Sequence, residues 1–169
     1  MLIVMDGKIS RMKMVGGLCS LAAALGIPSK PADAGEQHFE VTHTDAEWRA
    51  RLTPASYAVL RQHSTEAPGS SPLDHEKRAG TYLCAGCELA LFDAKTKFDS
   101  GTGWPSFYEP LKDAVEMSQD FSMIVPRTEV HCRRCGGHLG HVFDDGPKPT
   151  DLRYCMNGLA LTFKPAAAS

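Results

Sequence analysis

Two Cys-x-x-Cys pairs, separated by 44 residues, constrain this chain more than any other feature of its sequence. A tight turn with two residues between its thiols points backbone amides at the sulfurs. Two such turns offer the four thiolates that tetrahedral zinc binds at ~2.3 Å. Because four thiolates leave no open coordination position, the pattern predicts a structural zinc ion that joins two distant hairpins. The expected ligands are Cys84, Cys87, Cys132 and Cys135.

Two other readings of the pairs are redox motifs and disulfides within or between the pairs. A thioredoxin-like motif lies between a strand and a helix, and the residues after Cys87 and Cys135 do not have a helical pattern. The sequence therefore favours metal, although an oxidising compartment would compete for free thiols. Gly86, Gly136 and Gly137 are expected to supply the positive φ angles of the two turns.

The first 34 residues have the pattern of a secretory signal peptide. A basic start precedes the uncharged apolar stretch Met14–Ile27, and the small-x-small sequence Ala32–Ala34 follows. This pattern predicts cleavage after Ala34 and export to the periplasm; the alternative is a cytoplasmic protein that keeps its leader. Cleavage would also remove Cys19. The expected organisation is a leader at 1–34, a linker at 35–43 and one domain at 44–165.

Charge and hydropathy exclude two classes of partner. The net charge is −2 and the chain has no run of Lys and Arg, which argues against a nucleic-acid binder. No apolar stretch reaches the ~18 residues that a membrane span requires.

The sequence of residues 44–165 predicts two short helices followed by a β domain. Thr44–Glu47 fits a capping box, and Thr53–Pro54 fits a helix start with proline in the first turn. Residues 64–80 are expected to form a loop. The short strands expected after it suggest a small sandwich or barrel. The candidate strands are 81–84, 89–92, 106–108, 114–117, 122–125, 128–131, 141–143, 152–157 and 159–164.

A lone thiol, Cys155, lies in a strand-like segment between Arg153 and Asn157. Strand alternation places these three side chains on one face. Arg153 is expected to lower the pKa of the thiol and favour the thiolate, and Asn157 can donate a hydrogen bond to a substrate oxygen. The alternative is a half-buried structural cysteine, which is common for a lone cysteine.

Two histidines and a tryptophan are further candidates. His138 and His141 follow the second cysteine pair and can transfer protons near pH 7. They would face opposite sides of a regular strand, so we expect at least one to lie in the glycine turn. Trp104 lies in the loop Gly101–Phe107 and could floor an apolar pocket. Solvated histidines and a core tryptophan are the alternatives.

Together these segments resemble the methionine-R-sulfoxide reductase B family, in the same order from about Thr44 to Lys164. The segments that carry the resemblance are EWR at 47–49, LT at 52–53, CAGC at 84–87, KFDSGTGWPSF at 97–107, CxxC at 132–135, HLGHVF at 138–143 and RYCMNG at 153–158.

The resemblance implies a mainly β fold with two antiparallel sheets of the Mss4-like (β-tent) type, short N-terminal helices and a structural zinc site. It implies a peptide-methionine (R)-S-oxide reductase that repairs oxidised proteins or reduces free methionine-R-sulfoxide, as a monomer. Cys155 would attack the sulfoxide sulfur and become a sulfenic acid as methionine leaves. A thioredoxin-type or other thiol reductant would then regenerate the enzyme.

The resemblance also assigns roles around the thiol. The residues that bind or protonate the sulfoxide oxygen would be His138, His141, Asp145 and Asn157. The loop that carries Trp104 and Phe107 would bind the substrate, with the indole against the ε-methyl group. This arrangement selects the R epimer, because exchanging oxygen and methyl places a polar atom in an apolar pocket.

Two positions depart from the family pattern. Thr102 stands where many relatives carry a resolving cysteine, so the usual disulfide with Cys155 cannot form. Either an external thiol reduces the sulfenic acid or Cys19 does so in a chain that keeps its leader. The segment Gly69–Pro72 lacks the aromatic residues typical of the family, which affects the expected packing of that loop.

Overall fold

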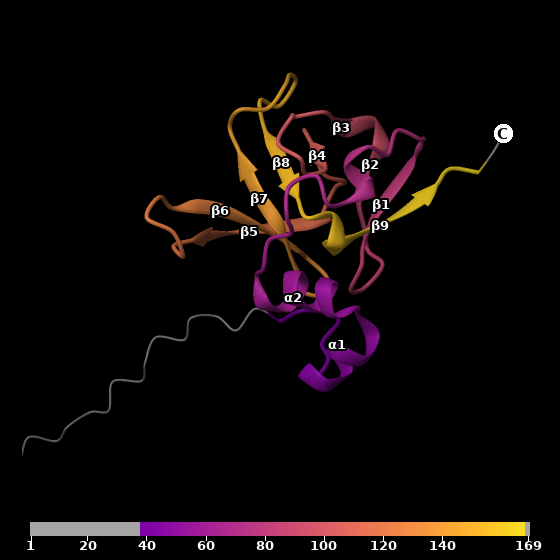
Figure 1. Cartoon of the computed structure of the whole chain (residues 1–169), viewed down its shortest axis with the longest axis vertical. Coiled ribbons are helices and arrows are strands. Elements are labelled where there is room, and N and C mark those ends of the chain that lie inside the picture. Colours follow the sequence, from indigo (N-terminus) through magenta and orange to yellow (C-terminus); the bar gives the residue numbers. More distant parts are fainter. Residues whose placement is uncertain (1–37, 168–169) are drawn as a thin grey trace, which may run out of the picture. The chain divides into compact units, whose positions relative to one another are not determined.

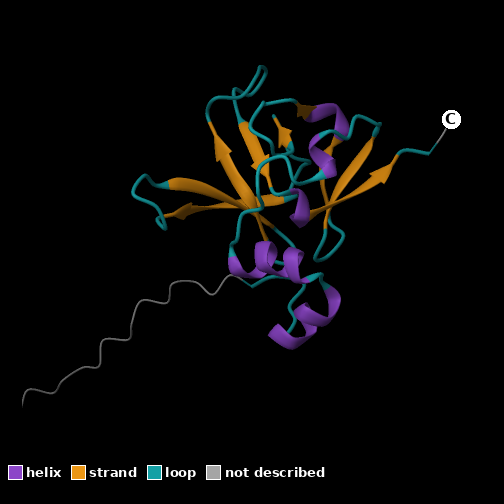
Figure 2. Cartoon of the chain, viewed as in Figure 1, coloured by secondary structure: helices purple, strands orange, loops and turns teal. Residues whose placement is uncertain are grey.

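The computed structural model describes residues 38–167 and contains two antiparallel sheets preceded by two short helices (Figure 1). The expected leader and Cys19 lie outside these residues. No helix in this part of the chain is long and apolar enough to cross a membrane. The predicted fold class, mainly β with two antiparallel sheets and N-terminal helices, is confirmed (Figure 2).

The two helices begin where the sequence predicts. Helix α1 spans Asp45–Arg51, and the capping box of Thr44 and Glu47 caps its N-terminus. Helix α2 spans Pro54–Gln62, and Thr53 caps it by accepting a hydrogen bond from the amide of Ser56. Trp48 of α1 and Leu60 of α2 are buried. Helix α2 packs against strand β7 (His138–Phe143) and the 3-10 turn η3 (Gly158–Ala160).

The smaller sheet has the order β2-β1-β9 and the larger has the order β3-β4-β8-β7-β6-β5. The strand bounds are β1 Gly80–Cys84, β2 Ala90–Asp93, β3 Lys97–Phe98, β4 Ser106–Phe107, β5 Val115–Asp120, β6 Arg127–Cys132, β7 His138–Phe143, β8 Arg153–Met156 and β9 Leu161–Pro165. Three 3-10 turns complete the regular structure: η1 Pro72–Asp74, η2 Ala94–Thr96 and η3 Gly158–Ala160.

An aromatic cluster joins the two sheets. Phe92 of β2 stacks on Phe107 of β4 with ring centroids 4.3 Å apart, and Tyr82 of β1 meets Phe107 edge-on at 4.9 Å. All three side chains are completely buried. Phe107, expected on the substrate side of its loop, therefore points into the core between the sheets.

Several observed strands differ from the predicted ones. Residues 122–125 form the connection between β5 and β6 instead of a strand. The two-residue strand β3 is too short to have a periodic signal of its own. Strand β7 begins at His138 instead of residue 141, because an irregularity in the strand breaks the alternation on which the prediction relied.

Candidate active site and metal centre

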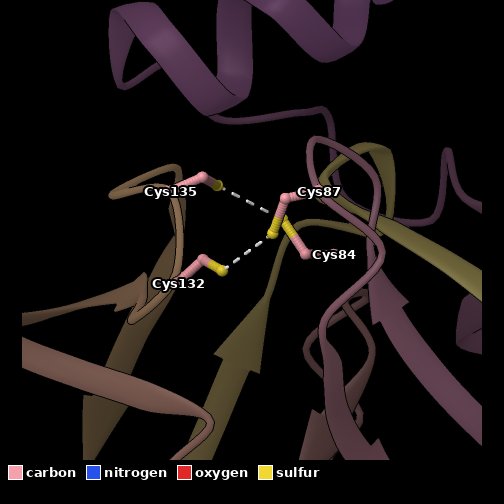
Figure 3. A group of neighbouring side chains, drawn as sticks. All are labelled: Cys84, Cys87, Cys132 and Cys135. Carbon is pink, nitrogen blue, oxygen red and sulfur yellow. Dashed lines mark hydrogen bonds between the residues drawn. The ribbon is translucent and has the colours of Figure 1, made fainter. Parts of the chain in front are cut away.

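Four cysteine sulfurs from the two sheets meet at one point (Figure 3). Cys84 and Cys87 come from the end of β1 and the turn after it, while Cys132 and Cys135 come from the end of β6 and the turn after it. The Sγ atoms of Cys84 and Cys135 are 3.7 Å apart, and those of Cys87 and Cys132 are 3.5 Å apart. A tetrahedral ion with ligands at ~2.3 Å places its sulfurs about 3.8 Å apart.

The donor set therefore fits a single metal ion. All five cysteines in residues 38–167 are free thiols, so the structure contains no disulfide among them. Hydrogen bonds among the four neighbouring thiols lower the pKa of Cys87 and Cys132 and raise the pKa of Cys84 and Cys135.

The two cysteine turns have the same backbone conformation. The amide of Glu88 donates to the carbonyl of Cys84, and the amide of Gly136 donates to the carbonyl of Cys132, each at 2.8 Å. Glu88 and Gly136 have φ angles of 60° and 65°. The left-handed residue is thus the one after the second cysteine. The prediction of positive φ is confirmed for Gly136 and wrong for Gly86 and Gly137.

His138 and His141 lie on the same face of β7 although they are three residues apart. The register between β6 and β7 shifts between Val130 and His131, which leaves Leu139 as an extra residue. Such a β-bulge resets the alternation of side chains, so the two imidazole centroids are 5.4 Å apart. The expectation that at least one histidine lies in the glycine turn is therefore wrong, because both belong to the strand.

Cys155 lies on β8, between Ser106 of β4 and His141 of β7 in the sheet register. Directly opposed residues share a face of the sheet, so the imidazole and the thiol are neighbours. Gly140 is required beside them, because a Cβ at this position would lie 2.1 Å from the carbonyl oxygen of Cys155.

The half-buried thiol opens into a pocket of about 120 Å³. The pocket is lined by Thr65, Trp104, Arg127, Gly140, His141, Phe143, Cys155 and Asn157. Four of the residues singled out in the sequence therefore meet in it: Trp104, His141, Cys155 and Asn157. His138 does not line this pocket; it lines a second recess, which it shares with His141.

Burial raises the pKa of the Cys155 thiol above its ordinary value. Thr102, whose Oγ1 lies 3.9 Å from the sulfur, acts in the opposite direction, as do Arg153 and Ser106. The predicted effect of Arg153 thus has the right sign, but burial outweighs it. The raised pKa favours the protonated thiol at neutral pH, in contrast to the thiolate that the sequence predicts.

Arg153 and Asp145 form a bidentate ion pair at the rim of the site. The Nε and Nη2 atoms of Arg153 donate to the two carboxylate oxygens of Asp145, both at 2.8 Å. This pairing lowers the pKa of Asp145. Neither residue lines the Cys155 pocket. Asp145 therefore acts on the site through Arg153, whose guanidinium lies close enough to the thiol to affect its pKa.

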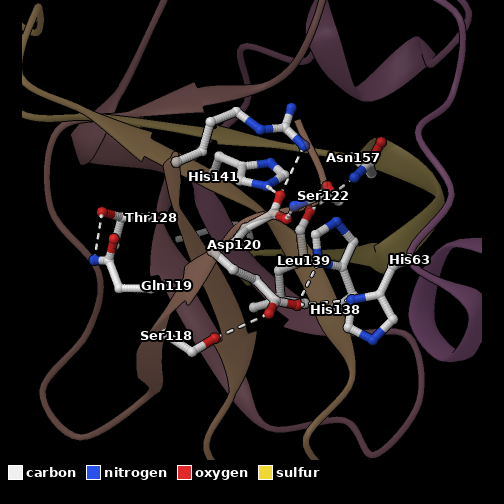
Figure 4. A network of polar contacts seen from close by, with 12 residues as sticks. His63, Ser118, Gln119, Asp120, Ser122, Thr128, His138, Leu139, His141 and Asn157 are labelled. Carbon is white, nitrogen blue, oxygen red and sulfur yellow. Dashed lines mark hydrogen bonds and ion pairs between the residues drawn. The ribbon is translucent and has the colours of Figure 1, made fainter. Parts of the chain in front are cut away.

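Each of the two histidines forms a hydrogen bond with a carboxylate (Figure 4). Asp120 accepts from Nε2 of His141 and Glu129 accepts from Nδ1 of His138, each at 2.7 Å. The bond from His138, aided by Ser118, lowers the pKa of Glu129 to about 2. Hydrogen bonds from Ser122 and His141 lower the pKa of Asp120.

An ionised carboxylate only accepts hydrogen bonds, so each imidazole directs an N–H at its partner. Burial lowers the pKa of His141 despite the bond to Asp120. His141 is therefore a neutral base at pH 7. His138 Nε2 is buried and has no hydrogen-bond partner in the described structure.

Asn157 and Trp104 are fixed by the loop that carries Glu66. The side chain of Asn157 donates to the carbonyl of Leu139 and accepts from the amide of Glu66. The indole Nε1 of Trp104 donates to the carbonyl of Glu66 at 3.1 Å. The carboxylate of Glu66 in turn binds the amide of Leu159 at 3.1 Å. The predicted loop 64–80 thus orients two walls of the pocket.

Several residues of the site carried no recognisable signal in the sequence. They are Thr65, Glu66, Asp120, Arg127 and Glu129. Asp120, Arg127 and Glu129 reach the site only through the pairing of β5, β6 and β7. Only the register of that sheet could have identified them.

The raised pKa of Cys155 is tested by alkylation. In metal-replete protein, the rate of iodoacetamide reaction at Cys155 is expected to rise with pH around a midpoint above the ~8.5 of an ordinary cysteine. Arg153→Gln removes a charge that favours the thiolate, so it should move the midpoint further up, whereas Arg153→Lys should move it less. A midpoint below 8 in the unaltered protein contradicts the dominance of burial.

Comparison with known proteins places these features in a family. The SelR domain model matches residues 52–165. Peptide methionine sulfoxide reductase MsrB of Leifsonia xyli subsp. xyli is 53% identical over 135 residues, covering 79% of this chain and 97% of that protein. The protein of the same name from Pseudomonas putida is 54% identical over 127 residues, covering 75% and 96%. The one from Methanosarcina barkeri is 52% identical over 125 residues, covering 73% and 88%. The chain therefore belongs to the SelR-domain family of MsrB-type peptide methionine sulfoxide reductases.

Proposed function

We propose that this protein reduces the R epimer of methionine sulfoxide, peptide-bound or free, with Cys155 as the nucleophile. The observation that carries the proposal is the meeting of a thiol, a neutral imidazole and an indole in one pocket, at Cys155, His141 and Trp104. This combination supplies a nucleophile for sulfur, a proton carrier and an apolar contact for a methyl group.

The reaction balances without an external proton. The Cys155 sulfur attacks the sulfoxide sulfur and its proton passes to the sulfoxide oxygen, with His141 as the carrier. The hydroxyl then moves from the substrate sulfur to Sγ, the substrate S–O bond and the transient Sγ–S bond break, and a cysteine sulfenic acid and methionine result. The substrate sulfur gains two electrons and Cys155 loses two. A thiol that keeps its proton at neutral pH therefore suits this chemistry, because it brings the proton that the oxygen needs.

The electrostatics around His141 favour its role as carrier. When the imidazole takes the proton, the ionised carboxylate of Asp120 at 2.7 Å stabilises the cation that forms. Arg127 also lines the pocket and binds the same carboxylate at 2.7 Å. The amide of Asn157 has one N–H left after it donates to Leu139, and this N–H is assigned to the sulfoxide oxygen.

Regeneration requires a thiol from outside the described domain. Thr102 occupies the place next to Cys155 where many relatives carry a resolving cysteine, and a hydroxyl cannot form a disulfide. The other four thiols in residues 38–167 belong to the metal quartet. In an exported protein cleaved after Ala34, Cys19 is also removed. Two thiol equivalents of a thioredoxin-type or small reductant then convert the sulfenic acid to thiol and water and become a disulfide themselves.

Cys155→Ser tests the nucleophile. The variant is expected to lose turnover of methionine-R-sulfoxide by at least a thousandfold, because a serine hydroxyl is a far weaker nucleophile than a thiol. Bound metal and thermal stability should be unchanged, since Cys155 does not touch the quartet. Turnover within tenfold of the unaltered protein would remove Cys155 from the mechanism.

The pocket also predicts stereochemistry. Incubation with a racemic sulfoxide and excess dithiothreitol should consume the R epimer and leave the S epimer, as resolved by chiral chromatography. The reason is that the indole of Trp104 offers an apolar contact on one side and His141 and Asn157 offer polar contacts on the other. Trp104→Ala should erode the preference. Equal consumption of both epimers by the unaltered protein contradicts the assignment.

We propose that the ion of the quartet is zinc, in a structural role, because four thiolates leave no position for substrate. Elemental analysis of the purified protein is expected to give one zinc per chain. Strong chelation at low pH should unfold the domain, as followed by circular dichroism, since the quartet joins the two sheets. Cys132→Ser should behave like the chelated protein. A folded, active protein without metal would show that the quartet has another role.

A further inference from the structure

Every large hydrophobic side chain that is exposed within residues 38–167 lies on the β5–β6 hairpin. Ile124 is fully exposed, and Phe121 and Val125 are more than 70% exposed. Figure 1 shows the connection between the two strands projecting beyond the rest of the sheet. Contiguous exposed apolar side chains are unfavourable in water and mark interaction sites. The complete set is Met117, Phe121, Met123, Ile124 and Val125.

The tip of this hairpin, residues 121–125, is fixed to the wall of the active site. One carboxylate oxygen of Asp120 accepts the amide of Ser122 at 2.9 Å. The other oxygen accepts from His141 and Arg127, each at 2.7 Å. The residue that holds the proton carrier therefore also holds the base of the apolar tip.

A recess lies between the base of the tip and the pocket of Cys155. Phe121 and Ser122 line this recess of about 250 Å³ together with His138 and His141. This recess shares His141 and Arg127 with the pocket of Cys155. The apolar tip is thus part of the rim around the site where the chemistry takes place.

The Cys155 pocket is too small for more than one side chain. Its volume of about 120 Å³ lies below the ~300–1,000 Å³ of pockets that enclose drug-sized ligands. When the substrate is a polypeptide, the residues on either side of the reacting one must lie outside, along the rim. The hairpin tip is the apolar part of that rim.

We infer that residues 121–125 dock the apolar side chains that flank methionine sulfoxide in an unfolded polypeptide. This inference rests on the proposed function and specifies its substrate class. Methionine is among the residues most often buried in folded proteins, and its oxidation disrupts hydrophobic cores. An oxidised methionine from a disrupted core is therefore exposed in an unfolded segment, and the residues next to it in that segment are apolar. Such residues match the apolar side chains of the tip.

The size of the tip favours a flexible chain over a second folded protein. Stable interfaces between folded proteins bury ~1,200–2,000 Å² in total, far more than a few side chains at the end of one hairpin can cover. A short apolar contact beside a catalytic pocket suits a transient complex, which must release its product at every turnover.

The double variant Ile124→Ser/Val125→Ser tests the inference, because neither residue lines the recess or the Cys155 pocket. Three substrates are compared: a peptide with apolar residues on both sides of one methionine-R-sulfoxide, a peptide of equal length with Ser and Gly there, and N-acetyl methionine-R-sulfoxide. The unaltered protein should prefer the apolar peptide. The double variant should lose about tenfold in kcat/KM on that peptide, mainly through KM, and remain unchanged on the other two.

Met117→Ser is the matched control. Met117 is a partly exposed methionine of the same hairpin, but it lines a different recess beside Leu111 and Tyr154, so its replacement should leave all three activities unchanged. Equal kcat/KM for both peptides in the unaltered protein overturns the inference, as does an unchanged preference in the double variant. A change in sedimentation velocity or in the KM for the thiol reductant, with peptide preference intact, assigns the tip to a second copy or to the reductant and also overturns it. Failure to reduce N-acetyl methionine-R-sulfoxide at all would instead refute the proposed function.

Discussion

Four cysteine sulfurs bring together one turn from each of the two sheets, and the strand that carries His138 and His141 begins directly after one of these turns. One pair of ligands lies at the end of β1 in the smaller sheet, and the other lies at the end of β6 in the larger. A metal ion that binds both pairs closes a long chain segment and fixes where β7 begins. Since His138 follows Cys135 by three residues, the position of the histidines depends directly on that closure.

The bulge at Leu139 places both histidines of β7 on the face of the sheet that carries Cys155. Without the extra residue, one histidine would face the core while the other faced the thiol, and only one carboxylate on β5 and β6 would find a partner. With it, His138 meets Glu129 and His141 meets Asp120. Both carboxylates are thereby ionised and hydrogen-bonded in a partly buried site, a situation that costs free energy unless the partners are well placed. The sheet register is therefore specified by the polar network as well as by the core.

The sequence predicted what depends on local patterns and missed what depends on the sheet register. The helix caps at Thr44 and Thr53, the metal quartet and the pocket residues Trp104 and Cys155 all lie in short motifs with a defined chemistry. The bulge has no local signal beyond Gly140, so both the start of β7 and the shared face of the histidines were missed. Arg153 illustrates another limit. The sequence correctly predicts that its charge lowers the pKa of Cys155, but burial of the thiol determines the net shift, and burial depends on the whole fold.

Asp120 connects the two halves of the proposed mechanism. Its carboxylate stabilises the protonated form of His141 and also fixes the amide of Ser122 at the base of the apolar tip. A polypeptide that displaces the tip would change the hydrogen bonds of this carboxylate, and through them the proton affinity of His141. Because Arg127 binds the same oxygen as His141, a shift of the tip would be transmitted to two walls of the pocket at once. One carboxylate thus contacts both the base of the apolar tip and the proton carrier of the proposed mechanism.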